Sequence, residues 1–166
     1  VAVPCQLGGG VRDEQTISRM LNAGLSRLVV GTQAIKRPDW FRSMCEKYPH
    51  KLALGIDAKG GLVATDGWLE VSEVTAIDLA RQFVDVPIDA IIYTDIAKDG
   101  MLQGPNFEAM QQMSDAVDIP VIASGGVTTA DDVSQLTDAG LAGCIIGRSL
   151  YEGQLELAEA LEAAAR

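Results

Sequence analysis

Histidine is almost absent from this sequence, and cysteine is scarce. His50 is the only histidine among 166 residues, and it lies in a polar stretch that we expect to be exposed. Histidine-based catalytic triads and zinc sites are therefore nearly excluded. The three cysteines, Cys5, Cys45 and Cys144, have no metal-like spacing, and an odd, scattered count is typical of reduced thiols in a cytoplasm. We therefore expect a cytoplasmic protein without a metal site.

Basic residues and long apolar runs are also in short supply. The 13 Lys and Arg residues are outnumbered by 23 Asp and Glu residues, which gives a net charge of −10. This balance argues against nucleic acid or an anionic membrane surface as a partner. No apolar run approaches the roughly 18 residues of a membrane-spanning helix. Any bound phosphate must be held by local groups, because the overall charge repels it.

What the sequence does contain is an internal repeat. The segment from Gly9 to Gly31 returns as Gly125 to Gly147, 116 positions later and without a gap. Eight of the 23 positions are identical, and most others keep their character. Each copy begins with Gly-Gly-Val, continues with a helical pattern, and then has Ala-Gly-Leu and a strand that ends in glycine.

The repeat is interpreted as an anion-binding unit that is used twice. Glycines after a strand leave backbone N–H groups facing a pocket at a helix N-terminus, where they can hold a phosphate. Two such units predict a ligand with two phosphates. The alternative is that the glycines only make tight turns in a repetitive α/β fold, although turns alone do not require the second glycines, Gly31 and Gly147.

Apolar runs alternate with helical patterns along the chain. The runs are continuous rather than alternating, as a parallel sheet covered by helices requires. They predict six strands, at 3–7, 28–30, 52–56, 90–94, 120–124 and 143–146. Helices are expected after Asp13, from Pro38, after Gly126, and at 73–83, 107–117 and 154–164, with a long loop at 58–68.

The repeat also predicts the architecture. One copy covers the first and second predicted strands and the other covers the fifth and sixth, so the copies lie four βα units apart. Two-fold symmetry with four units in each half predicts the eight units of a (β/α)8 TIM barrel. Residues 1–166 are expected to form a single partial barrel domain, with six units that correspond to strands three to eight and about 60–80 further residues in front. A doubly wound open sheet is the alternative, but it does not predict the repeat.

In (β/α)8 barrels the active site lies at the C-terminal ends of the strands. Asp57 follows the third predicted strand, and a carboxylate there can act as a general acid or base; it could instead cap a helix or pair with Lys59. Asp99, in a Lys-Asp-Gly loop, could bind sugar hydroxyls, share in proton transfer, or be a plain turn residue. Trp68 could be a lid that stacks on a planar ring or could pack on the surface. Asp95 is expected not to touch ligand, and Lys59 is expected to be solvated.

Together these residues resemble the phosphoribosylformimino-5-aminoimidazole carboxamide ribotide isomerases of histidine biosynthesis. The resemblance covers the whole chain in the family's order, from the family's third strand on. The motif set is specific, although each Gly-Gly alone is weak. It consists of Leu7–Arg12, Gly55–Lys59, Thr65–Trp68, Thr94–Gly100, Ser124–Val127 and Gly147–Tyr151.

The resemblance implies an Amadori rearrangement, from aminoaldose to aminoketose, of a small substrate with two phosphates, without metal or redox cofactor. Asp57 matches the family's general acid, and Thr94 and Asp99 match positions close to the reacting sugar. Trp68 matches the aromatic residue of the mobile loop. Gly9, Gly10, Gly31 and Thr32 match one phosphate site, and Ser124, Gly125, Gly126, Gly147 and Arg148 match the other.

One departure from the family concerns the general base. In the family the base is an aspartate on the first strand, which this chain does not contain, so we expect the 166-residue chain alone to be inactive or nearly so. Loss of one member of an acid–base pair costs on the order of 10²–10⁴-fold in rate. The strand edges at Val3–Leu7 and Cys144–Ile146 would stay unpaired, which favours self-association, complementation by an N-terminal fragment, or aggregation.

Two other functions stay open. The cyclase subunit of imidazole glycerol phosphate synthase shares the half-barrel repeat and the aspartate, but the Gly67-Trp68 loop and the Leu102–Asn106 segment favour the isomerase. The other alternative is a non-catalytic phosphosugar-binding fragment that keeps both phosphate sites. A dual-substrate isomerase that also serves tryptophan biosynthesis is compatible with the sequence.

Overall fold

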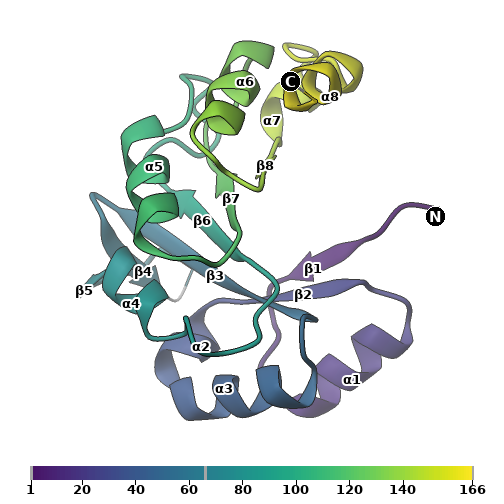
Figure 1. The fold of residues 1–166 in the computed structure, drawn as a ribbon, viewed down its shortest axis with the longest axis vertical. Coiled ribbons are helices and arrows are strands. Elements are labelled where there is room, and N and C mark those ends of the chain that lie inside the picture. The colour runs from purple at the N-terminus through teal and green to yellow at the C-terminus, as the bar shows by residue number, and fades with distance from the viewer. Residues whose placement is uncertain (1, 66, 166) are drawn as a thin grey trace.

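The computed structural model describes residues 2–65 and 67–165. Asp66, part of the Thr65–Trp68 motif, lies outside the described residues. Six parallel strands form one sheet in the order β1-β2-β3-β6-β7-β8. Figure 1 shows that this sheet curls, with helices on its convex face and with β1 and β8 at its two edges. The six strands are β1 (Gln6–Gly8), β2 (Arg27–Val30), β3 (Leu52–Lys59), β6 (Ile91–Asp95), β7 (Val121–Ser124) and β8 (Gly143–Ile145).

This topology confirms the predicted class, an incomplete (β/α)8 barrel with six βα units. Each parallel strand pairs with the parallel strand that comes before it in the chain, from β1 to β8. A doubly wound sheet would instead reverse its strand order at one point. The order here has no reversal, so that alternative is wrong.

Helices follow the strands and cover the outside of the sheet. The first is capped by Asp13, whose side chain accepts a hydrogen bond from the backbone N–H of Thr16 at 2.7 Å. Two short helices that were not predicted, α2 and α7, begin directly after Gly31 and Gly147. The helices are α1 (Glu14–Asn22), α2 (Thr32–Lys36), α3 (Pro38–Lys47), α4 (Ala76–Arg81), α5 (Phe107–Ala116), α6 (Ala130–Asp138), α7 (Arg148–Tyr151) and α8 (Leu157–Ala164).

The parallel strands are apolar on both faces, because one face meets the helices and the other lines the inside of the curl. On β3, Leu54 and Ile56 belong to the larger core between sheet and helices. Ala53 belongs instead to a small second core with Ala90 and Ile92. The alternation of side chains along β3 therefore sends Ala53, Gly55 and Asp57 to the inside of the curl.

The segment after Asp57 differs from the prediction. Residues 58–68 were expected to be a loop and 73–83 a helix, but β3 continues to Lys59 and is followed by β4 (Leu62–Thr65) and β5 (Glu70–Thr75). β4 pairs antiparallel with both β3 and β5. Helix α4 starts only at Ala76, where Thr75 caps it. Asp57 therefore lies inside a strand, two residues before its end.

The two edge strands of the curl are short and accessible. All three residues of β1 are exposed, as are the first and last residues of β8. Among the described residues, each of these strands pairs with one neighbour only, β1 with β2 and β8 with β7. Within the same residues, no helix combines the length and the apolar character that crossing a membrane requires.

Candidate active site

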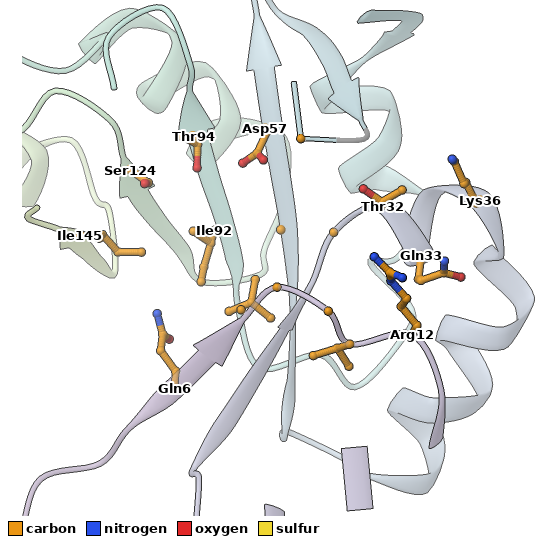
Figure 2. A pocket seen from close by; sticks show the side chains of 18 residues that line it. Gln6, Arg12, Thr32, Gln33, Lys36, Asp57, Ile92, Thr94, Ser124 and Ile145 are labelled. Carbon is orange, nitrogen blue, oxygen red and sulfur yellow. The ribbon is translucent and has the colours of Figure 1, made fainter. Parts of the chain in front are cut away.

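A row of polar side chains crosses the inside of the curl. Asp57 on β3 is the register partner of Thr94 on β6, and Thr94 is the partner of Ser124 on β7. Figure 2 shows the three side chains pointing into the same space from neighbouring strands. Thr94 is buried, and Asp57 and Ser124 are half-buried. The parallel strands thus bring together three residues that are far apart in the sequence, as the barrel topology predicts.

This row borders a cavity of about 800 Å³, which we call the larger cavity. Its size falls within the range of small-molecule sites. It extends from Ser124 past Asp57 to the turn after β1. The described residues that line it are Gln6, Gly8, Gly9, Gly10, Val11, Arg12, Val29, Gly31, Thr32, Gln33, Lys36, Gly55, Asp57, Gly67, Ile92, Thr94, Ser124 and Ile145.

A smaller cavity of about 250 Å³ adjoins it. Ser124 and Ile145 line both cavities, so the two share a wall. Asp99 lies in the smaller cavity, next to Gly100 and Leu102 of the loop after β6. The other described lining residues of the smaller cavity are Gly125, Gly126, Val127, Gly147, Arg148 and Ser149.

The internal repeat is reproduced in the backbone. Helices α1 and α6 occupy equivalent positions of the two copies, and so do the starts of α2 and α7. The φ angles are 93° at Gly9 and 95° at Gly125, in the left-handed region that favours glycine. Gly31 has φ −101° and ψ −101°, and Gly147 has φ −111° and ψ −102°. The predicted duplication is therefore confirmed.

We call the two copies of this backbone the N-terminal cradle (Gly9, Gly10, Gly31 and Thr32) and the C-terminal cradle (Gly125, Gly126, Gly147 and Arg148). The N-terminal cradle lines the larger cavity, and the C-terminal cradle lines the smaller one. Since the cavities share a wall, the two cradles open into neighbouring parts of one mouth. Asp57 lies in the larger cavity, on the strand between them in the sheet order.

The surroundings of the cradles differ. A Cβ atom placed on Gly125 would lie 2.6 Å from the carbonyl oxygen of Asp95, and one on Gly126 would lie 2.5 Å from that of Gly104. At Gly9 and Gly10 no described atom lies within 4 Å of such a Cβ. The C-terminal cradle is therefore packed against the loop after β6, and the N-terminal cradle is open.

Asp95 holds the loop that packs on the C-terminal cradle. Its carboxylate accepts hydrogen bonds from Ala97 N at 2.9 Å and from Asn106 Nδ2 at 2.6 Å. Its backbone oxygen accepts from Lys98 N and Asp99 N, each at 3.1 Å. Asp95 is buried and lines neither cavity. Its contacts are those of a residue that shapes the loop bearing Asp99.

Trp68 reaches Asp57 from the hairpin. The indole Nε1–H donates a hydrogen bond to Asp57 Oδ2 at 2.8 Å, while the Trp68 side chain remains 46% exposed. Lys59, which the sequence offered as a partner of Asp57, lies exposed at the end of β3 and lines neither cavity. The structure thus pairs Asp57 with the tryptophan of the loop rather than with Lys59.

Arg148 connects the C-terminal cradle to the loop after β6. Its Nη1 donates to the carbonyl oxygen of Gly100 at 2.7 Å, and its Nε donates to Glu152. The guanidinium lies at the start of α7 and lines the smaller cavity. Arg148 is therefore positioned to hold the loop and to offer positive charge to the cavity.

Four polar residues of the larger cavity were not predicted as site residues, although Arg12 belongs to the Leu7–Arg12 motif. Arg12, Gln33 and Lys36 lie near Thr32 at the N-terminal cradle, and Gln6 lies across the cavity from Ile92 (Figure 2). Arg12 follows the diglycine directly, and Gln33 and Lys36 follow Thr32 within one helical turn, so proximity to the repeat was the available signal. Arg12 and Lys36 supply local positive charge in a chain whose net charge is −10.

Among the described residues, no group of three or more His, Cys, Asp or Glu side chains could hold a metal ion. The polar atoms of the site are carboxylates, hydroxyls, amides, local cations and backbone N–H groups. Such a set can bind anions and transfer protons.

A curled sheet of parallel strands, with helices on its outside and a cavity where the strands end, defines the class of (β/α)8 barrel proteins, of which this chain has six βα units. The sequence profile of the family described as "Histidine biosynthesis protein" matches residues 1–156. The chain belongs to this family. The resemblance drawn from the motifs is thereby confirmed.

Named relatives are similar over almost the whole chain. The proteins from Rhodopirellula baltica, Pelobacter propionicus and Roseobacter denitrificans are 57%, 50% and 52% identical to it, over 98%, 97% and 97% of its length. All three are named 1-(5-phosphoribosyl)-5-((5-phosphoribosylamino)methylideneamino) imidazole-4-carboxamide isomerase. The chain spans 65%, 67% and 68% of their respective lengths.

Proposed function

We propose that this chain provides the aldose–ketose isomerase activity for which its relatives are named, the Amadori rearrangement of an aminoaldose to an aminoketose in histidine biosynthesis. The observation that carries the proposal is the position of Asp57 in a mouth shared by two anion cradles. The names of the relatives support the same reaction. The three free cysteines favour a reducing, cytoplasmic setting.

The two cradles hold the two phosphates of the substrate. At the N-terminal cradle, Gly9, Gly10, Gly31 and Thr32 offer backbone N–H groups, and Arg12 adds charge from beside them. At the C-terminal cradle, Ser124, Gly125, Gly126 and Gly147 have the same role, and Arg148 supplies the cation. Support comes from the matching backbone of the two sites, since N–H groups at the start of a helix favour phosphate.

Asp57 acts as the general acid between the phosphates. It protonates the ribose ring oxygen, the ring opens to a Schiff base, and a base removes the C2 proton to give the enol form of the ketose. Thr94 on β6 and Asp99 in the loop after β6 hydrogen-bond the sugar from the same side of Asp57. Trp68 donates its indole N–H to Asp57 Oδ2, which leaves Oδ1 of the carboxylic acid to carry the proton that is delivered.

This mechanism also needs a base that removes the C2 proton. Among the described residues that line the larger cavity, Asp57 is the only carboxylate. The edges of β1 and β8 flank the same cavity and each accepts a further strand. We propose that a polypeptide bound to these edges, either another segment or a second copy of this chain, completes one barrel domain and contributes the base.

A complementation assay tests this function. The purified chain is given the aminoaldose substrate alone and then with the remaining segment of a relative such as the Rhodopirellula baltica protein. We expect turnover with the segment and little without it, and we expect Asp57→Asn to lower the complemented activity by about 10²–10⁴-fold. Turnover that survives Asp57→Asn in the complemented protein would contradict the assignment of the acid.

A further inference from the structure

A third cavity, of about 480 Å³, lies on the outer side of the sheet. We call it the outer cavity. It is enclosed by the β3–β4 turn, the start of α4 and the first turns of α5. The described residues that line it are Gly60, Gly61, Leu62, Thr75, Ala76, Ile77, Tyr93, Asn106, Glu108, Ala109 and Gln112.

The outer cavity lies back to back with the active site. Tyr93 lines the outer cavity, while its neighbours Ile92 and Thr94 on β6 line the larger cavity. Successive residues of a strand point to opposite faces of the sheet. None of the residues that line the outer cavity lines either active-site cavity. It is therefore a separate space, divided from the mouth by the sheet itself.

The hydroxyl group of Tyr93 is a hydrogen-bond donor at the wall of this space. The residue is 3% exposed, and within the described part of the chain its hydroxyl makes no hydrogen bond to protein. Burial and the charge of Asp95 raise the pKa of Tyr93, so the phenol remains a neutral donor at physiological pH. Among the described residues, no side-chain polar atom is both fully buried and without a partner, so this hydroxyl reaches the open space of the cavity and can donate to a molecule bound there.

The charges around the cavity offset one another, so they favour ions of neither sign. Glu108 lies at the start of α5, where Gln112 Nε2 donates to its carboxylate at 3.2 Å, and a negative charge there repels anions. The positive N-terminal end of the same ten-residue helix disfavours cations. None of the described lining residues is Lys, Arg or His. Leu62, Ile77 and Ala109 supply apolar wall.

From this geometry we infer that the outer cavity binds a small uncharged organic molecule, with an apolar body and one carbonyl or similar acceptor that receives the Tyr93 O–H. Its volume is typical of small-molecule sites. The inference does not depend on the proposed isomerase activity, since the binding is measured directly and on the opposite face of the sheet.

Three probes of nearly equal size separate the possibilities: benzamide (neutral), benzoate (anionic) and benzylammonium (cationic). Binding to the whole protein is followed by saturation-transfer NMR. For molecules of this size we expect dissociation constants on the order of millimolar for benzamide, and binding at least about fivefold weaker for the two ions. Inorganic phosphate, which binds at the cradles, should not displace benzamide.

Variants assign the binding to the cavity. Tyr93→Phe keeps the ring and removes the donor, and we expect benzamide to bind about fivefold more weakly. Ala109→Leu fills the cavity and should abolish binding, whereas Ala158→Leu, the same change on the exposed face of α8, should leave it unchanged. Cooperative thermal unfolding of each variant shows that it is folded.

Several outcomes would overturn the inference. One is an ion that binds as tightly as benzamide. Another is benzamide affinity that neither Tyr93→Phe nor Ala109→Leu reduces. A third is the absence of binding by benzamide up to tens of millimolar, in which case water fills the cavity and satisfies Tyr93.

Discussion

The N-terminal and C-terminal cradles share a backbone conformation and differ in what lies against it. Their glycines have nearly equal dihedral angles and their helices start at equivalent positions. Yet Gly125 and Gly126 touch the loop after β6, while Gly9 and Gly10 face space that no described atom fills. Local sequence therefore sets the conformation of a cradle, and the βα loop of the preceding strand sets how tightly it is packed.

The difference in packing between the two cradles follows from their positions in the sheet. The loop that packs on the C-terminal cradle follows β6, the sheet neighbour of β7. The N-terminal cradle follows β1, which lies at an edge and has β2 as its one neighbour among the described strands. A strand added beside β1 would place its own loop against Gly9 and Gly10 in the same way.

The largest effect is a loss of turnover, and we expect it for a change at Asp57, which lies between the two cradles. Asp57→Asn removes the proposed general acid, and turnover of the complemented protein should fall by about 10²–10⁴-fold. Binding of the substrate's two phosphates should be nearly unchanged, because neither cradle is altered. Steady-state kinetics with direct binding measurements check both points. Asp118→Asn, at an exposed carboxylate outside the cavities, serves as control. A large loss of substrate affinity in Asp57→Asn would contradict the expectation that the cradles bind the phosphates independently of Asp57.

The next effect concerns stability at equivalent glycines. Gly126→Ala forces a Cβ to 2.5 Å from the Gly104 carbonyl oxygen at a positive φ, so we expect a loss of about 3–5 kcal/mol in the free energy of unfolding. Gly10→Ala has the strained φ but open space, and should cost only about 1–2 kcal/mol. Urea unfolding of both variants measures the two free energies of unfolding. Equal losses would show that the difference in packing between the two cradles does not affect stability.

A smaller effect is expected at the last position of each cradle, where Thr32 and Arg148 are equivalent in the repeat. Arg148→Ala removes a cation and the bond to Gly100, so affinity for the phosphorylated substrate should fall about tenfold. Thr32→Ala removes only a neutral hydroxyl and should weaken binding about threefold. Calorimetric titration distinguishes the two, and a larger effect at Thr32 would reverse the assigned roles.

The effect that is smallest near neutral pH concerns the thiols of the two halves. Burial raises the pKa of Cys45, on α3, to about 12, from an ordinary value of 9.0. The unfolded chain therefore loses the Cys45 proton at lower pH than the folded chain, so the free energy of unfolding should fall as pH rises from 9 towards 12. Urea unfolding across this range shows whether Cys45→Ala flattens the dependence of the free energy of unfolding on pH.

Cys144 is only half-buried on β8, so a thiol reagent should label it before it labels Cys45. The reverse order of labelling would contradict this expectation.

Most of the fold followed from the repeat. Its offset predicted parallel strands in sequential order and the cradle turns, because glycine spacing and apolar runs are local signals. The hairpin of β4 and β5 was missed because Val74 and Ile77 fit a helical period. What makes residues 70–75 a strand is pairing with β4, and β4 in turn pairs with β3, so no single stretch of sequence carries that information.

The site was predicted in part for the same reason. Strand ends located Asp57, Thr94 and Ser124 in one row, since parallel strands end at one edge of the sheet. The bond between Trp68 and Asp57 could not be predicted, because it depends on how the hairpin folds back. The contact of Asp95 with the C-terminal cradle is likewise a consequence of tertiary packing, between the end of β6 and the turn after β7.

The most direct test of the account is a crystal structure of the protein with the aminoketose product, which carries two phosphates. We predict one molecule per site, with one phosphate bound by the N–H groups of the N-terminal cradle, the other by those of the C-terminal cradle, and the sugar carbon beside Asp57. A molecule with both phosphates at one cradle, or one bound with its sugar remote from Asp57, would contradict the account.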